Sequence, residues 1–272
     1  MARRIFSSPL TVFGFLVVLL LLIFAAFAPL IAPHDPLEVD IVNKLQPPSS
    51  EHLFGTDEVG RDIFSRIIYG TRISLKIGLL VVVLSFPIGT ILGAIAGYFG
   101  GLVDSIIMRT TDIFLSFPGI ILAMSIAAAL GPSIENVLLA LAIVWWPWYT
   151  RIVRSSVLSI KNSEFIESAR AIGASPFRIL FKEVLPNSIA PASIQASLDL
   201  GFVILAAAGL SFIGLGAQPP SPEWGAMLSS SRENLREAWW AATFPGLAIL
   251  ITVLGFNLLG DGIRDILDPK QR

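Results

Sequence analysis

The chain is dominated by six long runs of apolar residues, which are separated by shorter polar segments. The runs lie near residues 10–32, 76–98, 113–131, 134–152, 188–216 and 240–260. Each run holds about the 20 residues that an α-helix needs to cross the roughly 30 Å hydrocarbon core of a bilayer. Backbone groups in lipid must hydrogen-bond within their own segment, so runs of this length predict helices. We therefore predict an all-α membrane protein with six transmembrane helices.

The first run has some features of a cleaved signal peptide. Arg3 and Arg4 precede it, and Ala26-Phe27-Ala28 has the small residues of a cleavage site. The run is longer than the roughly 7–15 residues of a signal core, and Pro29 directly follows the small residues. We expect an uncleaved membrane anchor.

Basic residues are distributed unevenly between the polar segments. Most of the 19 Lys and Arg residues fall near the chain ends, between the second and third runs, or between the fourth and fifth runs. The other polar segments hold more acidic than basic residues. Because cytoplasmic loops carry the excess of Lys and Arg, both the N- and the C-terminus are predicted to be cytoplasmic.

Two segments on the predicted outer side, 33–75 and 217–239, are long enough to fold. They fit either a lid over the helix ends or a docking surface for an extracytoplasmic partner, and the two roles are compatible. The two histidines of the chain, His34 and His52, have no carboxylate or second histidine at ligand spacing in a predicted helix, so no metal site is expected. We divide the chain into residues 1–75, an anchor helix and outer loop, and residues 76–272, a five-helix core with a cytoplasmic loop.

That cytoplasmic loop, residues 161–187, has the pattern of two short helices. Asn162-Ser163 offers an N-cap for the first helix, and Gly173 suits a left-handed cap at its end. Pro176 suits the first position of a second helix, and Pro186 is expected to close the unit.

The first of these helices has one apolar face. Phe165, Ala169 and Ile172 recur at helical spacing, with Glu167 off that face. Such a face fits a groove in a partner protein or the surface of a bilayer. Periodicity alone does not distinguish these two roles.

One acidic residue, Asp199, lies near the middle of the fifth run, and Gln195 lies one turn earlier on the same face. An ionisable group at this depth is costly unless it faces water or another helix. Asp199 and Gln195 are therefore candidate pore residues, with a structural contact between helices as the alternative.

Composition supports a lipid environment and excludes several functions. Hydrophobic residues make up 54% of the chain and charged residues 14%, and the mean hydropathy is +0.76, too little charge for a soluble domain of this size. Without cysteine there is no disulfide or thiolate site. A net charge of −1 gives no basic face for nucleic acid. The phosphate-binding motif G-x-x-x-x-G-K-[ST] is absent, so any ATPase that drives this chain must be another polypeptide.

Two other classes of membrane protein fit the sequence less well. A self-sufficient secondary transporter usually has matching halves with broken helices, and no clear internal repeat is found. A membrane-embedded enzyme needs a nucleophile, a base or metal ligands clustered at one depth, and none is visible.

The loop 161–187 resembles the coupling loop of ABC importer permeases. That pattern is Glu-Ala-Ala, three residues, Gly, and a later Leu-Pro. Glu167-Ser168-Ala169, Gly173 and Leu185-Pro186 fit it, with Ser168 in place of the middle alanine. The resemblance implies that six residues contact the ATPase: Phe165, Glu167, Ser168, Ala169, Gly173 and Pro186.

The resemblance extends along most of the chain. Residues 54–70, 97–113, 210–228 and 256–270 are similar to the peptide and nickel branch of these importers. Relatives often carry Glu where this chain has Ala207, so no role of that glutamate is carried over.

The resemblance implies a type I permease fold in the bacterial inner membrane and an ATP-driven import of dipeptides or short oligopeptides. Glutathione or a nickel chelate is the alternative cargo. The implied partners are a homologous permease that forms a heterodimer, two ATP-binding subunits that bind ATP and Mg, an extracytoplasmic solute-binding protein and membrane lipid. No catalytic residue, metal ligand or cofactor site is expected in this chain.

Overall fold

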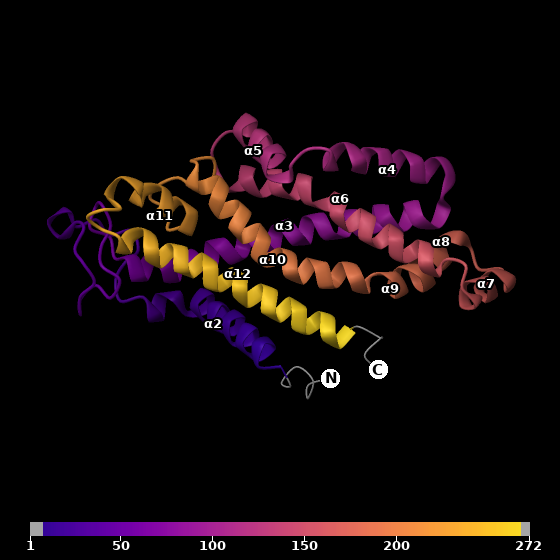
Figure 1. Cartoon of the computed structure of the whole chain (residues 1–272), viewed down its shortest axis with the longest axis horizontal. Coiled ribbons are helices and arrows are strands. Elements are labelled where there is room, and N and C mark those ends of the chain that lie inside the picture. Colours follow the sequence, from indigo (N-terminus) through magenta and orange to yellow (C-terminus); the bar gives the residue numbers. More distant parts are fainter. Residues whose placement is uncertain (1–7, 268–272) are drawn as a thin grey trace.

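The computed structural model describes residues 8–267, so Arg3 and Arg4 lie outside the described residues. Helices run along the long axis of an elongated molecule (Figure 1). Five helices are long and apolar enough to cross a membrane, and there are six such spans if one bent pair is counted as a span. The five are α2 (Pro9–Ile31), α3 (Ile63–Phe99), α6 (Ile134–Ile160), α10 (Ala190–Phe212) and α12 (Trp240–Leu267). The six-helix prediction is confirmed.

The span predicted near 113–131 is not one continuous helix, because a bend divides it between two helices. The bent pair consists of α4 (Gly101–Leu115) and α5 (Gly119–Leu130), whose axes differ in direction by 84°. The break falls at Phe117-Pro118. Proline has no N–H and disfavours the helical conformation of the residue before it, so the sequence does carry a signal for this bend.

Helix α3 begins at Ile63, well before the predicted start at residue 76. Asp62 caps it by accepting a hydrogen bond from the Ser65 N–H at 2.7 Å, which is a standard N-cap contact. The first turns of α3, before residue 76, hold polar residues, and a hydropathy pattern does not assign such residues to a spanning helix. The boundary between residues 75 and 76 thus falls inside α3, and the division of the chain into these two parts stays a prediction.

Small residues bring α3 and α6 into close contact. Gly89, Gly93 and Gly97 lie one turn apart on α3, and a Cβ on any of them would collide with the backbone or a Cβ of α6. This is the small-xxx-small arrangement by which membrane helices approach each other closely. The largest buried cluster, which includes Tyr149 and Leu141, lies beside this contact.

A half-buried arginine, Arg72, joins α3 to α2 near the outer side. Pro29 lies inside α2 and has no N–H, so it cannot donate to the Ala25 carbonyl. The Arg72 guanidinium donates instead, to the carbonyls of Ala25 and Ala26. Arg72 therefore satisfies backbone groups freed by a proline.

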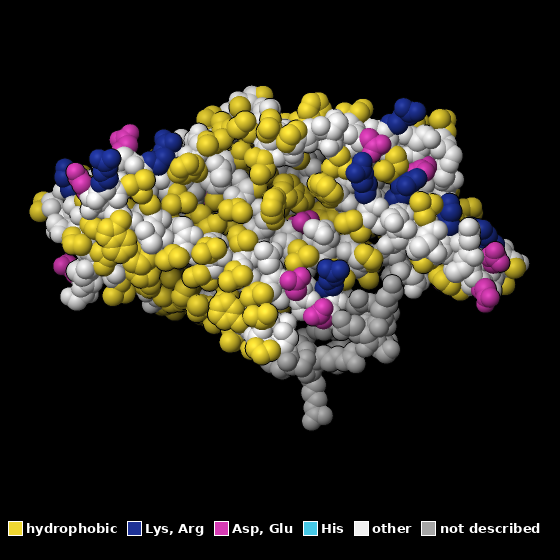
Figure 2. Space-filling view, in the orientation of Figure 1, with side chains coloured by type: hydrophobic (Ala, Val, Ile, Leu, Met, Phe, Trp, Pro, Cys, Tyr) yellow, Lys and Arg dark blue, Asp and Glu magenta, His cyan; other side chains and the backbone are white. Residues whose placement is uncertain are grey.

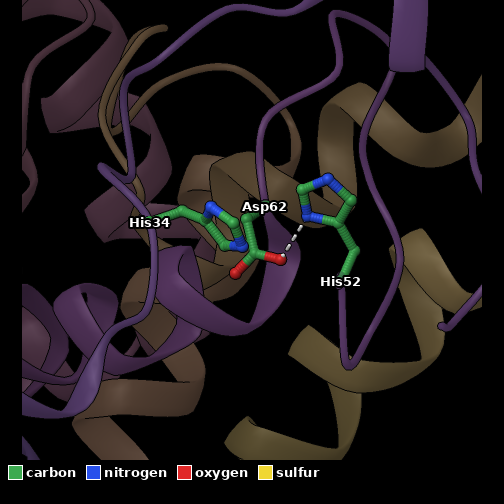
Figure 3. Close-up of side chains that lie close together, drawn as sticks. All are labelled: His34, His52 and Asp62. Atoms are coloured by element: carbon green, nitrogen blue, oxygen red, sulfur yellow. Dashed lines mark hydrogen bonds and ion pairs between the residues drawn. The ribbon is translucent and has the colours of Figure 1, made fainter. Parts of the chain in front are cut away.

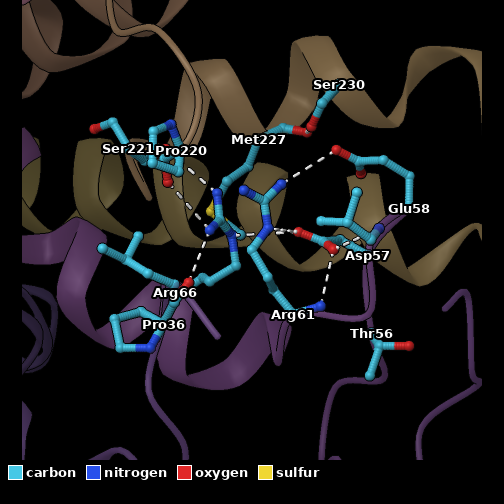
Figure 4. Close-up of polar contacts among 12 residues, drawn as sticks. Pro36, Thr56, Asp57, Glu58, Arg61, Arg66, Pro220, Ser221, Met227 and Ser230 are labelled. Carbon is cyan, nitrogen blue, oxygen red and sulfur yellow. Dashed lines mark hydrogen bonds and ion pairs between the residues drawn. The ribbon is translucent and has the colours of Figure 1, made fainter. Parts of the chain in front are cut away.

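The two outer segments fold against each other, as a lid over the helix ends requires. Arg66 is 3% exposed and donates to the carbonyls of Pro36 at 2.8 Å and of Pro220 and Ser221 at 3.3 Å (Figure 4). Asp57 supports this contact through an ion pair with Arg61 at 2.7 Å. One residue thus holds the segment after α2 to the segment before α11 (Trp224–Ser231).

Hydrophobic side chains cover much of the middle of the visible surface, and most charged side chains lie toward the two ends of the long axis (Figure 2). A smaller charged group lies in the lower middle of this view. Exposed apolar residues are a normal feature of spanning helices because lipid is their solvent. This distribution fits a molecule whose long axis crosses the bilayer.

Candidate functional site

The loop predicted as two short helices folds at one end of the molecule, beyond the spanning helices (Figure 1). It contains α7 (Glu164–Ala171), α8 (Pro176–Ile179), a π-helical turn (Leu180–Val184) and α9 (Leu185–Ser188). The prediction that Pro186 closes the unit is wrong, because the helical path continues to Ser188. The π-helical turn ends where the Leu185 N–H donates to the Leu180 carbonyl. Pro186 follows in the first turn of α9, where no N–H is required.

The left-handed cap predicted at Gly173 is confirmed. Gly173 has φ of +79°, its N–H donates to the Arg170 carbonyl at 2.9 Å, and the Ala174 N–H donates to the Ala169 carbonyl at 3.1 Å. This pair of bonds is a Schellman motif. Glycine adopts this conformation without a Cβ penalty, so Gly173 fixes the angle between α7 and α8.

The apolar face predicted on α7 points away from the rest of the chain. Phe165 is 44% exposed and Ile172 is 86% exposed, whereas Ala169 is half-buried. The neighbouring Ile166 is fully buried instead, in a cluster with Val153 and Val157 of α6. Ile166, with Ala169 packed against the same cluster, therefore anchors α7, and Phe165 and Ile172 remain exposed for a further contact.

The remaining predicted coupling residues lie on the same exposed unit. Glu167, Ser168, Gly173 and Pro186 are all exposed. Phe177 of α8, at 65% exposed, extends the apolar surface beyond α7. The structure thus brings the six residues to one end of the molecule, with Pro186 displaced from α7 by the intervening α8 and π turn.

Three contacts brace this unit against the inner end of α3. The Lys161 ammonium donates to the Gly97 carbonyl at 3.2 Å. The Arg170 guanidinium lies 5.9 Å from the centre of the Tyr98 ring, within the range of a cation–π contact. The Phe99 and Phe177 rings are 5.8 Å apart. Because these contacts involve α3 directly, movement of the unit relative to α3 would break them.

Asp199 lies in a buried polar group between α10 and α6. It is 7% exposed, and one of its oxygens accepts a hydrogen bond from the Gln195 side chain at 2.9 Å. The other oxygen has no partner among the described residues, and neither has the hydroxyl of Tyr149, which is fully buried on α6. Tyr149 packs edge-on against Phe86 of α3, with ring centres 5.3 Å apart.

The prediction that Gln195 and Asp199 lie on the same face of one helix is confirmed. Tyr149, which lies beside Asp199 but belongs to another helix, was not predicted as part of this group. The aromatic run at 145–149 was the available signal, since a tyrosine hydroxyl buried in a membrane protein requires a polar neighbour. One oxygen of the buried Asp199 carboxylate therefore has no hydrogen bond among the described residues.

The structure also brings together three residues that sequence spacing did not connect. His34, His52 and Asp62 come from three separate parts of the outer segment, yet their side chains meet (Figure 3). They belong to irregular chain and a helix N-cap, so helical spacing could not reveal them.

Two family models match the sequence. Residues 89–272 match the family of binding-protein-dependent transport system inner membrane components. Residues 1–48 match the N-terminal transmembrane domain of oligopeptide transport permease C.

Several curated proteins are similar along almost the whole chain. The probable D,D-dipeptide transport system permease protein of Escherichia coli is 50% identical over 97% of this chain and 89% of its own length. A dipeptide transport system permease protein of Alkalihalophilus pseudofirmus is 49% identical over 99% of this chain and 89% of its own length. A glutathione transport system permease protein of Pectobacterium atrosepticum is 48% identical over 99% of this chain and 90% of its own length.

A solved chain of the MetNI methionine ABC transporter, in an inward-facing conformation, has a similar fold. The TM-score is 0.60 at 19% sequence identity, and the match covers 76% of this chain and 98% of that chain. At this identity the likeness concerns the fold alone.

Proposed function

Because the chain belongs to the family of binding-protein-dependent transport system inner membrane components, and is thus an ABC importer permease of the bacterial inner membrane, we propose that it carries dipeptides or short oligopeptides into the cell. The observation that carries this proposal is the full-length similarity to permeases named for D,D-dipeptides and dipeptides. The glutathione permeases at 48% identity support a second candidate cargo, glutathione, which is itself a small peptide.

Transport requires energy that this chain does not supply by itself. Its sequence lacks the phosphate-binding G-x-x-x-x-G-K-[ST] motif. Two separate ATP-binding subunits, which bind ATP and Mg, would provide the hydrolysis. The exposed apolar face of α7 supports this arrangement, because an amphipathic helix that projects beyond the bilayer can dock in a groove of a partner.

The contacts of the α7 unit suggest how hydrolysis would move the spanning helices. Ile166 is packed against α6, and Lys161 and Arg170 contact the inner end of α3. Packed cores do not deform continuously, so displacement of α7 by an ATPase would shift α3 and α6 together. Phe165 and Ile172 would be the anchors that receive this displacement, and Glu167 would make a polar contact beside them.

A second, homologous permease would complete the pore. The α4–α5 pair presents a row of exposed apolar side chains, which include Leu102, Ile106, Ile113 and Ile120. Either lipid or a helix of a partner can cover such an apolar surface. We assign the face to the sister permease, because a bent pair of helices crosses the bilayer poorly without support. An extracytoplasmic solute-binding protein would dock on the outer lid and deliver the cargo.

Asp199, Gln195 and Tyr149 would line the translocation path in this complex. A peptide has a positively charged amino terminus, and the carboxylate of Asp199 would attract it. Asp199 is buried within the single chain, so opening of the path would require α6 and α10 to separate.

The cargo is tested by reconstituting the complex of both permeases, both ATPases and the binding protein in liposomes. We expect ATP-dependent uptake of a labelled dipeptide, which an excess of unlabelled dipeptide suppresses more strongly than glutathione does. The ligand retained by the co-expressed binding protein should be a dipeptide by mass spectrometry. Suppression by glutathione alone would replace the dipeptide with the second candidate, and uptake without ATP would contradict the transporter class.

A further inference from the structure

The predicted extracytoplasmic segment contains a group of three side chains suited to a metal ion. His34 follows α2, His52 lies in the turn that precedes α3, and Asp62 is the N-cap of α3 (Figure 3). One ring nitrogen of each histidine and one carboxylate oxygen of Asp62 lie within 4.8 Å of one another. The two imidazole rings are 4.7 Å apart between centres. These are the only histidines in the chain.

Each of the three ligands is held in place by hydrogen bonds to neighbouring groups. The His34 N–H donates to the Ser65 hydroxyl at 3.1 Å, and its ring nitrogen Nε2 lies 3.0 Å from the Glu51 carbonyl. One oxygen of Asp62 accepts the Ser65 N–H at 2.7 Å, and the other lies 2.9 Å from Nδ1 of His52. The group is thus pre-positioned, and its carboxylate is almost completely buried.

The donor set matches the chemistry of zinc. Zn²⁺ binds histidine nitrogen and carboxylate oxygen at about 2.0–2.2 Å in tetrahedral sites, which places ligand atoms roughly 3.4 Å apart. The observed separations would close by about an ångström through rotation of the imidazole rings. Three protein ligands leave a fourth position for water.

The surroundings of the group favour a cation. The side chains border a cavity of about 190 Å³, and Asp35, Glu38, Asp40 and Glu51 also line it. Among the described residues that line this cavity there is no lysine or arginine. Negative charge concentrated in a small cavity raises the local concentration of divalent cations.

From this convergence we propose that His34, His52 and Asp62 bind one divalent transition-metal ion of the zinc type. The ion would join the segment after α2 to the first turn of α3 and to the turn at His52. It would therefore fix the segment after α2, which Arg66 also holds through the Pro36 carbonyl. The alternative is that His52 and Asp62 only form a hydrogen bond with each other and that no metal binds. The test must distinguish this case from metal binding.

The test uses the full-length chain in detergent, purified without a polyhistidine tag, and Zn²⁺ as the probe in equilibrium dialysis. We expect one bound ion per chain. His34→Gln and His52→Asn remove a nitrogen ligand but keep an amide near the positions of Nε2 and Nδ1. Asp62→Asn keeps an oxygen to cap α3. Each variant should weaken zinc affinity about tenfold or more, whereas Glu237→Gln, at an exposed residue that does not line the cavity, should leave it unchanged.

X-ray absorption of the zinc-loaded wild type gives a second readout that does not depend on variants. Two imidazole ligands are expected, and because the chain has only two histidines they must be His34 and His52. Zinc should also raise the thermal midpoint of the wild type and of Glu237→Gln, but not of the three ligand variants. The proposal is overturned if no stoichiometric zinc binds, if the ligand variants bind as tightly as wild type, or if the spectrum shows fewer than two imidazoles.

Discussion

Asp199 has two carboxylate oxygens, and among the described residues only one is hydrogen-bonded, by Gln195. A purely structural contact would be expected to use both, because an unsatisfied buried acceptor costs about 1–3 kcal/mol. Tyr149 of α6, whose hydroxyl also lacks a hydrogen bond among the described residues, lies beside Asp199. We propose the pore role, with a structural contact between helices as the alternative.

Asp199→Asn tests that role. If Asp199 attracts the cargo, the amide should leave assembly and basal ATP hydrolysis intact but slow peptide uptake, because size and hydrogen bonding are kept while the charge is lost. Uptake normalised to assembled complex is the measurement. Asp199→Leu is the companion variant, which leaves Gln195 without its partner and should cost about 1–2 kcal/mol of stability. Wild-type uptake by the Asn variant would remove Asp199 from the pore.

At the scale of elements, the angle between α7 and α8 depends on one residue. Gly173→Pro removes the N–H that donates to Arg170 and cannot adopt a positive φ. We expect the chain to insert and assemble, while the cargo-stimulated ATP hydrolysis of the complex is lost. Gly173→Asn is the matched control, because asparagine tolerates the left-handed conformation. Stimulated hydrolysis at the wild-type rate in the proline variant would contradict the coupling assignment.

The contact between α3 and α6 depends on glycine in a different way. A Cβ at Gly93 would lie 2.5 Å from the Thr150 carbonyl oxygen, which is a backbone atom and cannot move aside easily. Gly93→Ala should therefore lower stability by about 1–3 kcal/mol. Gly209→Ala on α10 has no atom within 4 Å of its new Cβ and should be neutral or slightly stabilising. Unfolding of both variants in mixed detergent measures the difference, and equal stabilities would argue against the close contact.

For the whole molecule, the orientation in the membrane follows from the uneven distribution of Lys and Arg. Ser50 lies in the outer segment and Asn162 at the start of the α7 unit, and both are exposed. A cysteine at Ser50 should react with an impermeant thiol reagent in intact cells, and a cysteine at Asn162 should react only after lysis. The wild-type chain contains no cysteine, so it serves as the unlabelled control. The reverse order of labelling would invert the topology.

The helical class, the number of spans and the cap at Gly173 could be predicted from the sequence alone, because each depends on residues close together in the chain. Hydropathy over about 20 residues is sufficient to identify a spanning helix, and the pattern at 167–186 was sufficient to suggest the family. The spacing of Gln195 and Asp199 likewise predicted their contact.

The contacts between distant segments could not be predicted in this way, because they depend on how the helices pack together. Ile166 rather than Phe165 anchors α7, because Ile166 is the side chain that packs against Val153 and Val157 of α6. Arg72 serves carbonyls freed by Pro29 in another helix, Tyr149 faces Asp199 from another helix, and His34, His52 and Asp62 meet across an irregular loop. Local periodicity predicts which face of a helix is apolar, but it does not predict which other element covers that face.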